Sequence, residues 1–238
     1  LGLFDFLDAI AAVPFRDRIK KIKQPKCAEK AAFYGGCLVD FAYPEMGEAV
    51  VKVLNKAGIE VIFPQGQTCC GAPARYSGAY EVAAQNGADN VEALLSEDVK
   101  YVVSACPTCT VALKEDFIHS MEAVGRTADL PAAHKLSEKV WDFSTLVAQL
   151  VEQGRLKFKK GLEPTKFTYH DSCHFKRSLH ADQNPRNLMK QAGLELVEMD
   201  ESDMCCGMGG SYTIKLPEIS APILERKLVN IEKTGVPL

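Results

Sequence analysis

Short apolar runs alternate with longer amphipathic segments along most of the chain. The runs have the length and apolar character of buried strands, whereas the longer segments repeat their apolar residues at helical spacing. The predicted strands cover residues 31–36, 59–64, 99–105, 166–171 and 194–199. The predicted helices cover residues 45–58, 78–96, 109–124, 184–193 and 219–235. This alternation predicts an α/β fold of parallel strands joined by right-handed helical crossovers.

The two halves of this pattern repeat each other. The spacing from Cys37 to Cys69 is 32 positions, and the spacing from Cys173 to Cys205 is also 32. The segment KAAFYGGC is matched by KFTYHDSC, AGIEV is matched by AGLEL, and both halves continue as CCG. Several matching features at a fixed spacing indicate a repeated structural unit. We therefore predict two pseudo-repeated Rossmann-like modules with parallel sheets, in which the cysteines are offset by 136 residues.

The repeat divides the chain into four predicted segments. They are an N-terminal helix and basic linker at residues 1–29, the first module at 30–130, a bridging helical segment at 131–163, and the second module at 164–238. The N-terminal segment has two interpretations. It is either a packed helix followed by a solvated linker, or a docking arm for a partner or a membrane surface.

Composition narrows the class of protein. The chain has 238 residues and a net charge of −3, so its composition does not favour nucleic acid as a partner. It contains no run of about 18 apolar residues that could span a membrane, and no secretory signal pattern. Nine cysteines in such a chain favour metal binding or redox chemistry in the cytoplasm over a disulfide framework. Among them, Cys27 lies outside the repeat and is interpreted as an incidental thiol.

Five cysteines of the first module fall just after predicted strands. Cys37 follows the first strand, Cys69 and Cys70 follow the second, and Cys106 and Cys109 follow the third. The carboxyl ends of parallel strands form the binding crevice of an open sheet, so we expect these sulfurs to converge on a metal site. Five thiolates exceed the four ligands of a structural zinc and favour an iron–sulfur centre. Zinc and a dithiol–disulfide redox site stay open as alternatives.

The second module repeats only part of this set. It contains Cys173, Cys205 and Cys206, whereas the positions that correspond to the closing pair, 242 and 245, lie beyond residue 238. The simplest interpretation is a chain truncated just before its last ligand loop. The alternative is a natively incomplete site helped by His170 or His174, because imidazole can replace thiolate on iron or zinc. These histidines have a further interpretation as hydrogen-bonding residues that shape the strand end. We expect the second site to be poorly loaded or empty.

The cysteine pattern resembles the cysteine-rich CCG-domain family over residues 30–238. The motifs that carry the resemblance are C…CCG…CPTC in the first half and HDSCH…CCGMGG in the second. The family includes the heterodisulfide reductase B and D subunits and the iron–sulfur subunit of glycolate oxidase, and this sequence is most similar to the lactate-utilisation protein A type. The resemblance implies an unusual non-cubane [4Fe–4S] cluster on five cysteines of a module. The implied ligands are Cys37, Cys69, Cys70, Cys106 and Cys109, with Cys173, Cys205 and Cys206 in the second module.

The resemblance also implies a function. We expect an iron–sulfur electron-transfer module of an oxidoreductase, for the oxidation of L-lactate or a related 2-hydroxy acid. The expected partners are other iron–sulfur or flavin subunits, in the cytoplasm or, through those partners, at the inner face of the membrane. Two alternatives remain. One is a heterodisulfide or thiol–disulfide reductase subunit in which substrate sulfurs meet the cluster, and the other is a zinc-stabilised scaffold.

Overall fold

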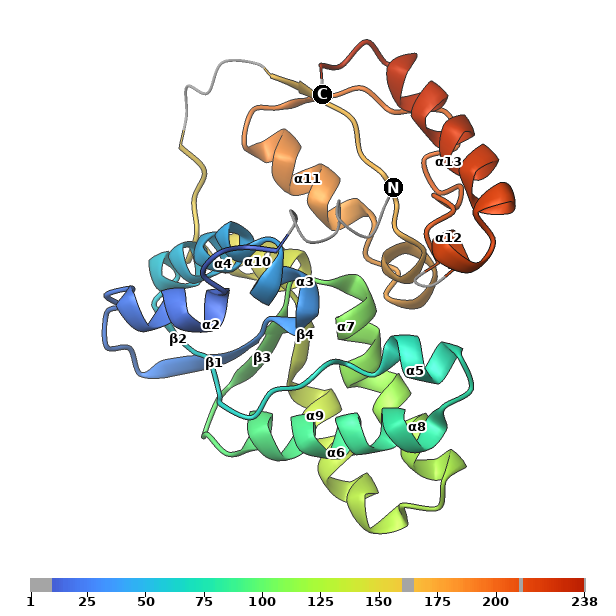
Figure 1. Ribbon diagram of the computed structural model, residues 1–238. Coiled ribbons are helices and arrows are strands. Elements are labelled where there is room, and N and C mark those ends of the chain that lie inside the picture. The colour runs from blue at the N-terminus through green and yellow to red at the C-terminus, as the bar shows by residue number, and fades with distance from the viewer. Residues whose placement is uncertain (1–9, 160–164, 210–211, 238) are drawn as a thin grey trace. The chain divides into compact units, whose positions relative to one another are not determined.

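The computed structural model describes residues 10–159, 165–209 and 212–237. The chain divides into two compact units, Leu1–Leu156 and Lys157–Leu238, and each contains one parallel sheet (Figure 1). The prediction of an α/β fold with parallel sheets is therefore confirmed. The helix expected at the N-terminus falls largely on residues 1–9, outside the described part of the chain.

The strands and helices of the described residues follow the predicted alternation. The strands of the first unit are β1 (Glu29–Tyr34), β2 (Ile59–Ile62), β3 (Tyr101–Ser104) and β4 (Val140–Asp142). Its α-helices are α2 (Phe15–Arg18), α3 (Gly36–Phe41), α4 (Pro44–Lys56), α5 (Ala72–Tyr76), α6 (Tyr80–Leu95), α7 (Pro107–Val111), α8 (Phe117–Ala123), α9 (Leu130–Lys139) and α10 (Phe143–Glu152). Short 3-10 turns lie at Ile19–Lys21 and Thr127–Asp129, and a π-helical turn lies at Ala112–Asp116. The second unit contains β5 (Lys166–Phe167), a π-helical turn (His174–Ser178), α11 (Gln183–Gln191), β6 (Glu195–Leu196), α12 (Tyr212–Lys215) and α13 (Pro217–Glu232).

The sheet of the first unit has the strand order β2-β1-β3-β4, and every neighbouring pair is parallel. Helices α2, α4 and α10 pack on one face, and α6, α8 and α9 pack on the other (Figure 1). The chain adds β2 on one side of β1 and then adds β3 and β4 on the other side, so the order of strand addition reverses between β1 and β3. In doubly wound folds, the carboxyl ends of the strands beside such a reversal form the ligand-binding crevice.

Side chains of β1 alternate between the two faces of the sheet, because successive residues of a strand point to opposite sides. Ala31 and Phe33 join the apolar cluster under α4, whereas Ala32 and Tyr34 join the cluster under α6. All four residues are fully buried. Both faces of this parallel sheet are therefore covered, which explains the nearly continuous apolar character of the strand in the sequence.

Part of the N-terminal segment packs into the first unit. Phe15 of α2 is 0% exposed, and its ring meets the rings of Phe33 and Phe63 edge to face at centroid distances of 5.3 and 5.5 Å. Gly47 of α4 leaves room for this ring, since a Cβ atom there would lie 2.4 Å from the Phe15 Cδ2 atom. Ile19 is also buried in this cluster. The apolar side chains of this basic segment thus belong to the core of the first unit.

The segment predicted to bridge the modules also belongs to the first unit. It is not continuously helical, because β4 lies between α9 and α10 and pairs with β3 through Val102 and Val140. A strand of three residues is too short for an alternating pattern to reveal it in the sequence. Asp142 at the end of β4 caps α10, and its carboxylate accepts a hydrogen bond from the Thr145 N–H group at 3.0 Å.

The second unit preserves the strand pairing of the first. Lys166 of β5 pairs with Glu195 of β6, as Lys30 of β1 pairs with Glu60 of β2. The offset is 136 residues for the first member of each pair and 135 residues for the second. The segments AGIEV and AGLEL show the same offset of 135. The second copy therefore has one residue fewer before β6 and one residue more between β6 and its cysteine pair.

A network of charged side chains stabilises the interior of the second unit. Arg186 of α11 is 4% exposed and donates to both carboxylate oxygens of Asp171, at 2.6 and 2.9 Å. It also donates to Glu198 at 3.2 Å, and its guanidinium lies 4.9 Å from the centroid of the Tyr169 ring. The Ser202 hydroxyl donates to Asp171 at 2.8 Å. These contacts tie α11 to the chain after β5 and to the loop after β6.

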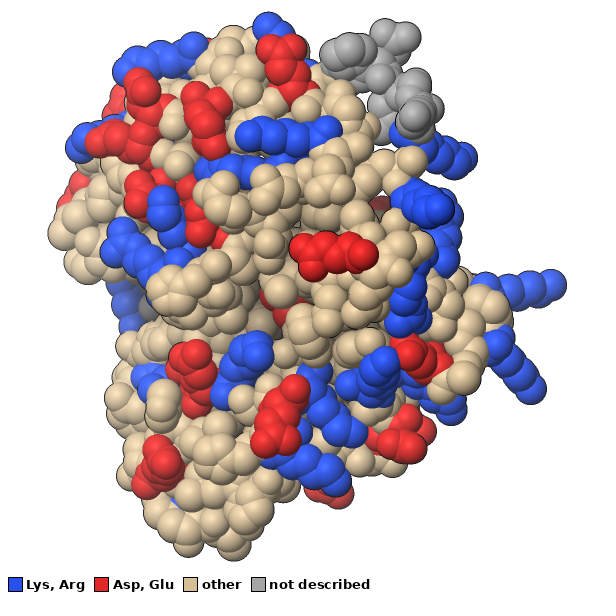
Figure 2. Space-filling view, turned by 180° about the vertical axis from the view of Figure 1, so that it is seen from behind, with Lys and Arg blue, Asp and Glu red and all other residues tan. Residues whose placement is uncertain are grey.

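Charges of both signs are interspersed on the surface. Figure 2 shows Lys and Arg side chains beside Asp and Glu side chains over much of the face in view. This distribution agrees with the small net charge of −3. Within the described ranges, every helix is too short or too polar to cross a bilayer.

Phe15→Ala is expected to lower the free energy of unfolding of the first unit by about 3–5 kcal/mol, because it removes a buried ring from a packed core. Urea-induced unfolding measures this change through the fluorescence of Trp141, the single tryptophan, which lies in β4. Val13→Ala is the control, since Val13 is 41% exposed. Equal unfolding midpoints for the two variants would show that Phe15 is not part of the core.

Arg186→Met is expected to destabilise the second unit by about 3–5 kcal/mol, since it leaves the Asp171 carboxylate buried without its partner. Hydrogen exchange of the backbone amides of β5 and α11, measured by mass spectrometry, reports this loss. Glu195→Gln is the matched control because it removes an exposed ion pair, 3.9 Å from Lys166, that contributes little. Unchanged exchange in Arg186→Met would rule out a stabilising role for the buried pair.

Candidate metal centre

The five cysteines of the first unit lie beyond the carboxyl ends of three strands. Cys37 lies in the first turn of α3, directly after β1. Cys69 and Cys70 precede α5 on the connection that leaves β2. Cys106 is the N-cap of α7 after β3, and Cys109 lies within that helix. Because β1 lies between β2 and β3 in the sheet, all three cysteine-bearing segments start at neighbouring strand ends.

The five thiols influence one another's pKa, so they act as one electrostatic group. The thiols of Cys37 and Cys70 both interact with the sulfur of Cys69 as donors. The thiol of Cys109 interacts with the sulfurs of both Cys70 and Cys106. All nine cysteines of the chain are free thiols. Sulfurs from three separate connections are thus brought into one group.

Two of these sulfurs have a lowered pKa, which favours their thiolate form. The hydrogen bonds from Cys37 and Cys70 hold the pKa of Cys69 well below that of an ordinary thiol. The hydrogen bond from Cys109 lowers the pKa of Cys106 in the same way. The pKa values of the donors Cys37 and Cys109 are raised by these same bonds and by burial. Since thiolate is the form that binds metal, the group concentrates ligand charge at one place.

Backbone N–H groups also stabilise charged sulfurs. The N–H group of Gly71, the N-cap of α5, points at the Cys69 sulfur, and N–H groups of α7 point at the Cys106 sulfur. The first turn of a helix has N–H groups without intrahelical partners, so these donors are available to the sulfurs. The second unit repeats the contact, because Gly207 N–H donates to Cys205 Sγ at 3.3 Å.

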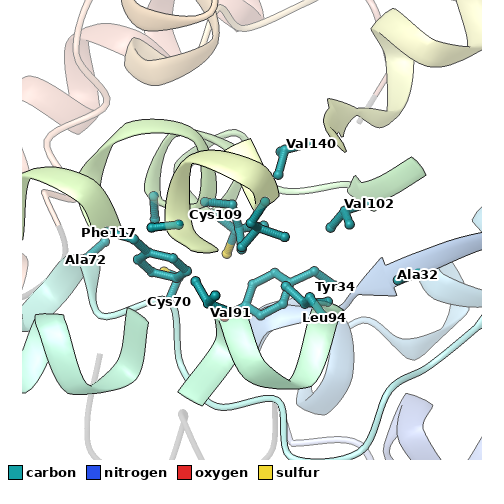
Figure 3. Packing of buried hydrophobic residues seen from close by; sticks show 14 of the residues in the cluster. Ala32, Tyr34, Cys70, Ala72, Val91, Leu94, Val102, Cys109, Phe117 and Val140 are labelled. Carbon is teal, nitrogen blue, oxygen red and sulfur yellow. The ribbon is translucent and has the colours of Figure 1, made fainter. Parts of the chain in front are cut away.

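Tyr34 fixes the loop that carries two of the sulfurs. Its ring is fully buried in the same cluster as Cys70 and Cys109 (Figure 3), and its hydroxyl donates to the Thr68 carbonyl at 2.7 Å. Burial and the negative charge of the nearby sulfurs raise the pKa of Tyr34, so it remains a neutral donor. The side-chain amide of Gln67 also attaches this loop to β1, because it donates a hydrogen bond to the Phe33 carbonyl at 3.0 Å.

Asn90 of α6 holds the same loop from the helical layer. Its side chain is 0% exposed, and its carboxamide oxygen accepts from the Thr68 N–H group at 3.0 Å. Its amide group donates to Thr68 Oγ1 and to the Cys69 carbonyl, both at 3.1 Å. A buried polar side chain whose groups are all engaged restricts the position of its partners. Asn90 is therefore a positioning residue for the cysteine pair.

Gly36 allows the backbone to approach Cys109 closely. Its φ angle is +60°, in the left-handed region that favours glycine, and a Cβ atom there would lie 2.8 Å from the Cys109 Sγ atom. Any larger residue would therefore displace this sulfur. The sequence motif contains the glycine, but its contact with a cysteine more than 70 positions away follows only from the fold.

The five sulfurs differ in their access to solvent. Cys37 and Cys69 are exposed, whereas Cys70 is 6% exposed and Cys109 is 4% exposed. The exposed pair lines a cavity of about 170 Å³ together with Arg16 of α2. A centre held by this group would have one side in the apolar core and one side open to a small molecule or a partner protein.

The second unit brings its three cysteines to the equivalent place. Cys173 is the N-cap of the π-helical turn after β5, and Cys205 and Cys206 lie on the loop after β6. Burial, together with the negative charges of Cys205 and Cys206, raises the pKa of Cys173. His170 Nδ1 lies 3.3 Å from the Ser202 carbonyl oxygen, so this histidine helps to shape the loop.

Neither set has the geometry of a single-ion site. Among the described residues, no three or more His, Cys, Asp or Glu side chains are arranged to hold one metal ion. A tetrahedral zinc requires four donors at about 2.3 Å from one point. A multi-iron centre instead spreads its thiolates over several irons. The five sulfurs of the first unit are one more than a tetrahedral zinc ion requires.

The residues that position the cysteines were not found from the sequence. Tyr34 belongs to an apolar strand and Asn90 to an amphipathic helix, and neither pattern indicates a polar role. The repeat does contain one sequence signal for the role of Tyr34, because Tyr34 corresponds to His170. Both side chains contact a carbonyl of the loop before the cysteine pair of their unit. His174 lies in the π-helical turn beside the second set. Cys27 contacts the nearby Pro25 carbonyl at 3.6 Å.

The family model of the cysteine-rich domain, CCG, matches residues 31–114 and 167–238, which contain both cysteine sets. The chain belongs to the cysteine-rich CCG-domain family. It is 33% identical over 211 residues to lactate utilization protein A 1 of Bacillus mycoides (strain KBAB4), with 88% of this chain and 83% of the relative covered. It is 36% identical over 206 residues to lactate utilization protein A of Shouchella clausii (strain KSM-K16), with 85% and 82% covered. For lactate utilization protein A of Bacillus subtilis (strain 168), the identity is 32% over 213 residues, with 87% and 84% covered. The predicted resemblance is confirmed.

In this CCG-domain protein, Gly36→Ala is expected to reduce the metal bound by the first unit several-fold, because the added Cβ atom would displace the Cys109 sulfur. Metal analysis of protein purified without oxygen measures the effect. Gly78→Ala is the matched control, since Gly78 also has a positive φ of +83° but has no heavy atom within 4 Å of the added Cβ. Both variants carry left-handed strain of about 1–2 kcal/mol, so equal metal contents would argue against the steric explanation.

Proposed function

We propose that this chain is an iron–sulfur electron-transfer module of an oxidoreductase that oxidises L-lactate or a related 2-hydroxy acid. The observation that carries the proposal is the group of five linked sulfurs at neighbouring ends of parallel strands. The names of the relatives, lactate utilization protein A, support the substrate class. The proposed partners are iron–sulfur or flavin subunits that deliver and accept the electrons.

The proposed ligands are the cysteines that both units place at their strand ends. The first unit would hold a non-cubane [4Fe–4S] cluster, and the second unit would contribute its three cysteines to a second centre. The proposed ligands are Cys37, Cys69, Cys70, Cys106 and Cys109 in the first unit, and Cys173, Cys205 and Cys206 in the second. When bound, such a centre supplies the storage and transfer of single electrons.

The residues of the chain prepare the first site for this chemistry. Tyr34 and Asn90 fix the loop of the cysteine pair, so little ordering remains to be done when a centre binds. Backbone N–H groups donate to the charged sulfurs, and hydrogen bonds to sulfur are among the features that set the reduction potential of such centres. The burial of Cys70 and Cys109 shields one side of the site from water.

A thiol–disulfide reductase is the second candidate function. The observation that favours it is the cavity of about 170 Å³ lined by the exposed Cys37 and Cys69. A substrate sulfur could reach the group at this point without any movement of the core. The zinc-stabilised scaffold has less support, because five sulfurs exceed the requirement of one zinc ion.

Protein purified without oxygen is expected to contain about four irons and four sulfides per intact centre, with broad visible absorption that dithionite bleaches. Cys69→Ser and Cys109→Ser should each remove most of the iron of the first unit. Cys27→Ser is the control and should leave it unchanged, since Cys27 lies outside the group. One zinc, no sulfide and no colour in the wild-type protein would rule out the electron carrier.

Reduction of a low-molecular-weight disulfide by reduced viologen separates the two redox candidates. The electron carrier predicts iron and colour without turnover of the disulfide. Turnover that disappears in Cys37→Ser and persists in Cys27→Ser would favour the reductase instead.

A further inference from the structure

Two helical segments start at the first cysteine group. Helix α5 begins just after Cys69 and Cys70, the adjacent pair. Helix α7 starts at the closing pair, because Cys106 is its N-cap and Cys109 lies within it. The π-helical turn Ala112–Asp116 continues α7 without a break. Contacts between these two segments can therefore fix the two cysteine pairs relative to each other.

An ion pair joins the two segments. Arg75 of α5 contacts Asp116 of the π-helical turn, with 3.0 Å between the Arg75 Nε and Asp116 Oδ1 atoms, and their side chains are 20% and 12% exposed. Arg75 also donates to the hydroxyl oxygen of Ser120, a fully buried residue, at 3.1 Å. The hydroxyl of Tyr76 donates to the other carboxylate oxygen of Asp116 at 3.2 Å. A largely buried ion pair with additional hydrogen bonds restricts the position of both partners.

The ion pair lies one helical turn from the adjacent pair. The Arg75 N–H group donates to the carbonyl of Gly71, the residue that follows Cys70, at 2.9 Å. Gly71 itself lies against α6, since a Cβ atom there would be 3.1 Å from the Cα atom of Ala83. Helix α5 is therefore held at its start by α6 and further along by the ion pair.

The other side of the ion pair is fixed by the apolar core. Phe117 directly follows Asp116, is 1% exposed, and belongs to the same cluster as Cys70 and Cys109 (Figure 3). Cys109 lies seven residues before Asp116 in one continuous helical run. The π-helical turn lies between them, and such turns are rare and recur at functional sites.

We propose that Arg75 and Asp116 are positioning residues of the first cysteine group, and that their ion pair holds the adjacent pair against the helix of the closing pair. In this role, which rests on the proposed function, they act through the ligands of the centre and touch neither the centre nor a substrate. Tyr34 and Asn90 attach the loop of the adjacent pair to β1 and α6. The ion pair adds the attachment between the adjacent pair and the closing pair.

Alkylation of the buried sulfurs in the reduced, metal-free protein tests the proposal. Cys70 and Cys109 are 6% and 4% exposed, so iodoacetamide reaches them only when their segments open locally. We expect Arg75→Met to raise the alkylation rates of both sulfurs about tenfold, because Asp116 loses its partner and α5 detaches from the π-helical turn. Mass spectrometry of the peptides gives the rate at each cysteine. Wild-type rates in Arg75→Met would overturn the proposal.

Hydrogen exchange of the backbone amides separates a local effect from a general loss of stability. In Arg75→Met, the exchange rates of β1 and β3 should rise by a smaller factor than the alkylation rates. Arg126→Met is the matched control, since it removes another ion pair of the same unit, with Asp129 at 2.6 Å and side chains that are 34% and 36% exposed. It should leave the alkylation rates unchanged. Equal factors for exchange and alkylation, or an equal rise in the control, would overturn the proposal.

Two milder variants decide the question if Arg75→Met does not fold. Tyr76→Phe removes only the hydroxyl that donates to Asp116, so it should raise the alkylation rates about two- to fivefold. Arg75→Lys keeps the charge but loses the fork of guanidinium donors, so its rates should lie between those of the wild type and of Tyr76→Phe or above. Wild-type rates in both variants would contradict a positioning role.

Iron measurements separate this proposal from the proposed function. In protein that contains iron, Arg75→Met should lose it to a chelator about tenfold faster than the wild type, and Arg126→Met should not. Equal rates of loss in the three proteins would overturn the role of the ion pair and leave the iron–sulfur centre in place. Protein without iron or sulfide would defeat the proposed function, but the alkylation rates would still decide the role of Arg75 and Asp116.

Discussion

The candidate site of the first unit depends on the parallel pairing of β1 with a neighbour on each side. Ala32 pairs with Ile62 of β2, and Tyr34 pairs with Ser104 of β3. This register brings the three cysteine-bearing connections to one edge of the sheet and turns Tyr34 toward the helical layer that contains Asn90. A slip of one residue would turn Tyr34 to the opposite face. The loop that holds the cysteine pair would then lose its main attachment.

The two units use the same strand register but fill their interiors differently. Where α4 buries Val50 and Val51, the corresponding turn of α11 buries Arg186, whose charge is matched by Asp171. An apolar core tolerates small changes of packing, whereas a buried ion pair requires both partners and their hydrogen bonds. Asp171 lies two residues before Cys173, so the polar interior and the second cysteine set are joined directly in the chain.

The sequence was sufficient where local pattern and repetition agreed. Long strands and helices and the spacing of the cysteines could be predicted, because each depends on residues close in the chain or on a repeat. β4 could not be predicted, since three residues show no period, and Phe15 was hidden because basic neighbours dominate its segment. Tyr34 and Asn90 both act through hydrogen bonds to Thr68, which is separated from them by 34 and 22 positions in the sequence. Such contacts follow from the register of the sheet and leave no local pattern.

The proposed electron carrier has two conflicting requirements, and the first site would meet both. The centre must be protected from water, which would otherwise attack it, but it must also come close enough to a partner to exchange electrons. Cys70 and Cys109 extend into the apolar cluster with Tyr34, whereas Cys37 and Cys69 face a cavity at the surface. The adjacent cysteines Cys69 and Cys70 therefore lie on opposite sides of the site, one open and one buried. Because the two cysteines are adjacent, one short loop supplies both a buried and an exposed sulfur. Two cysteines on separate loops would require a longer stretch of chain to be ordered.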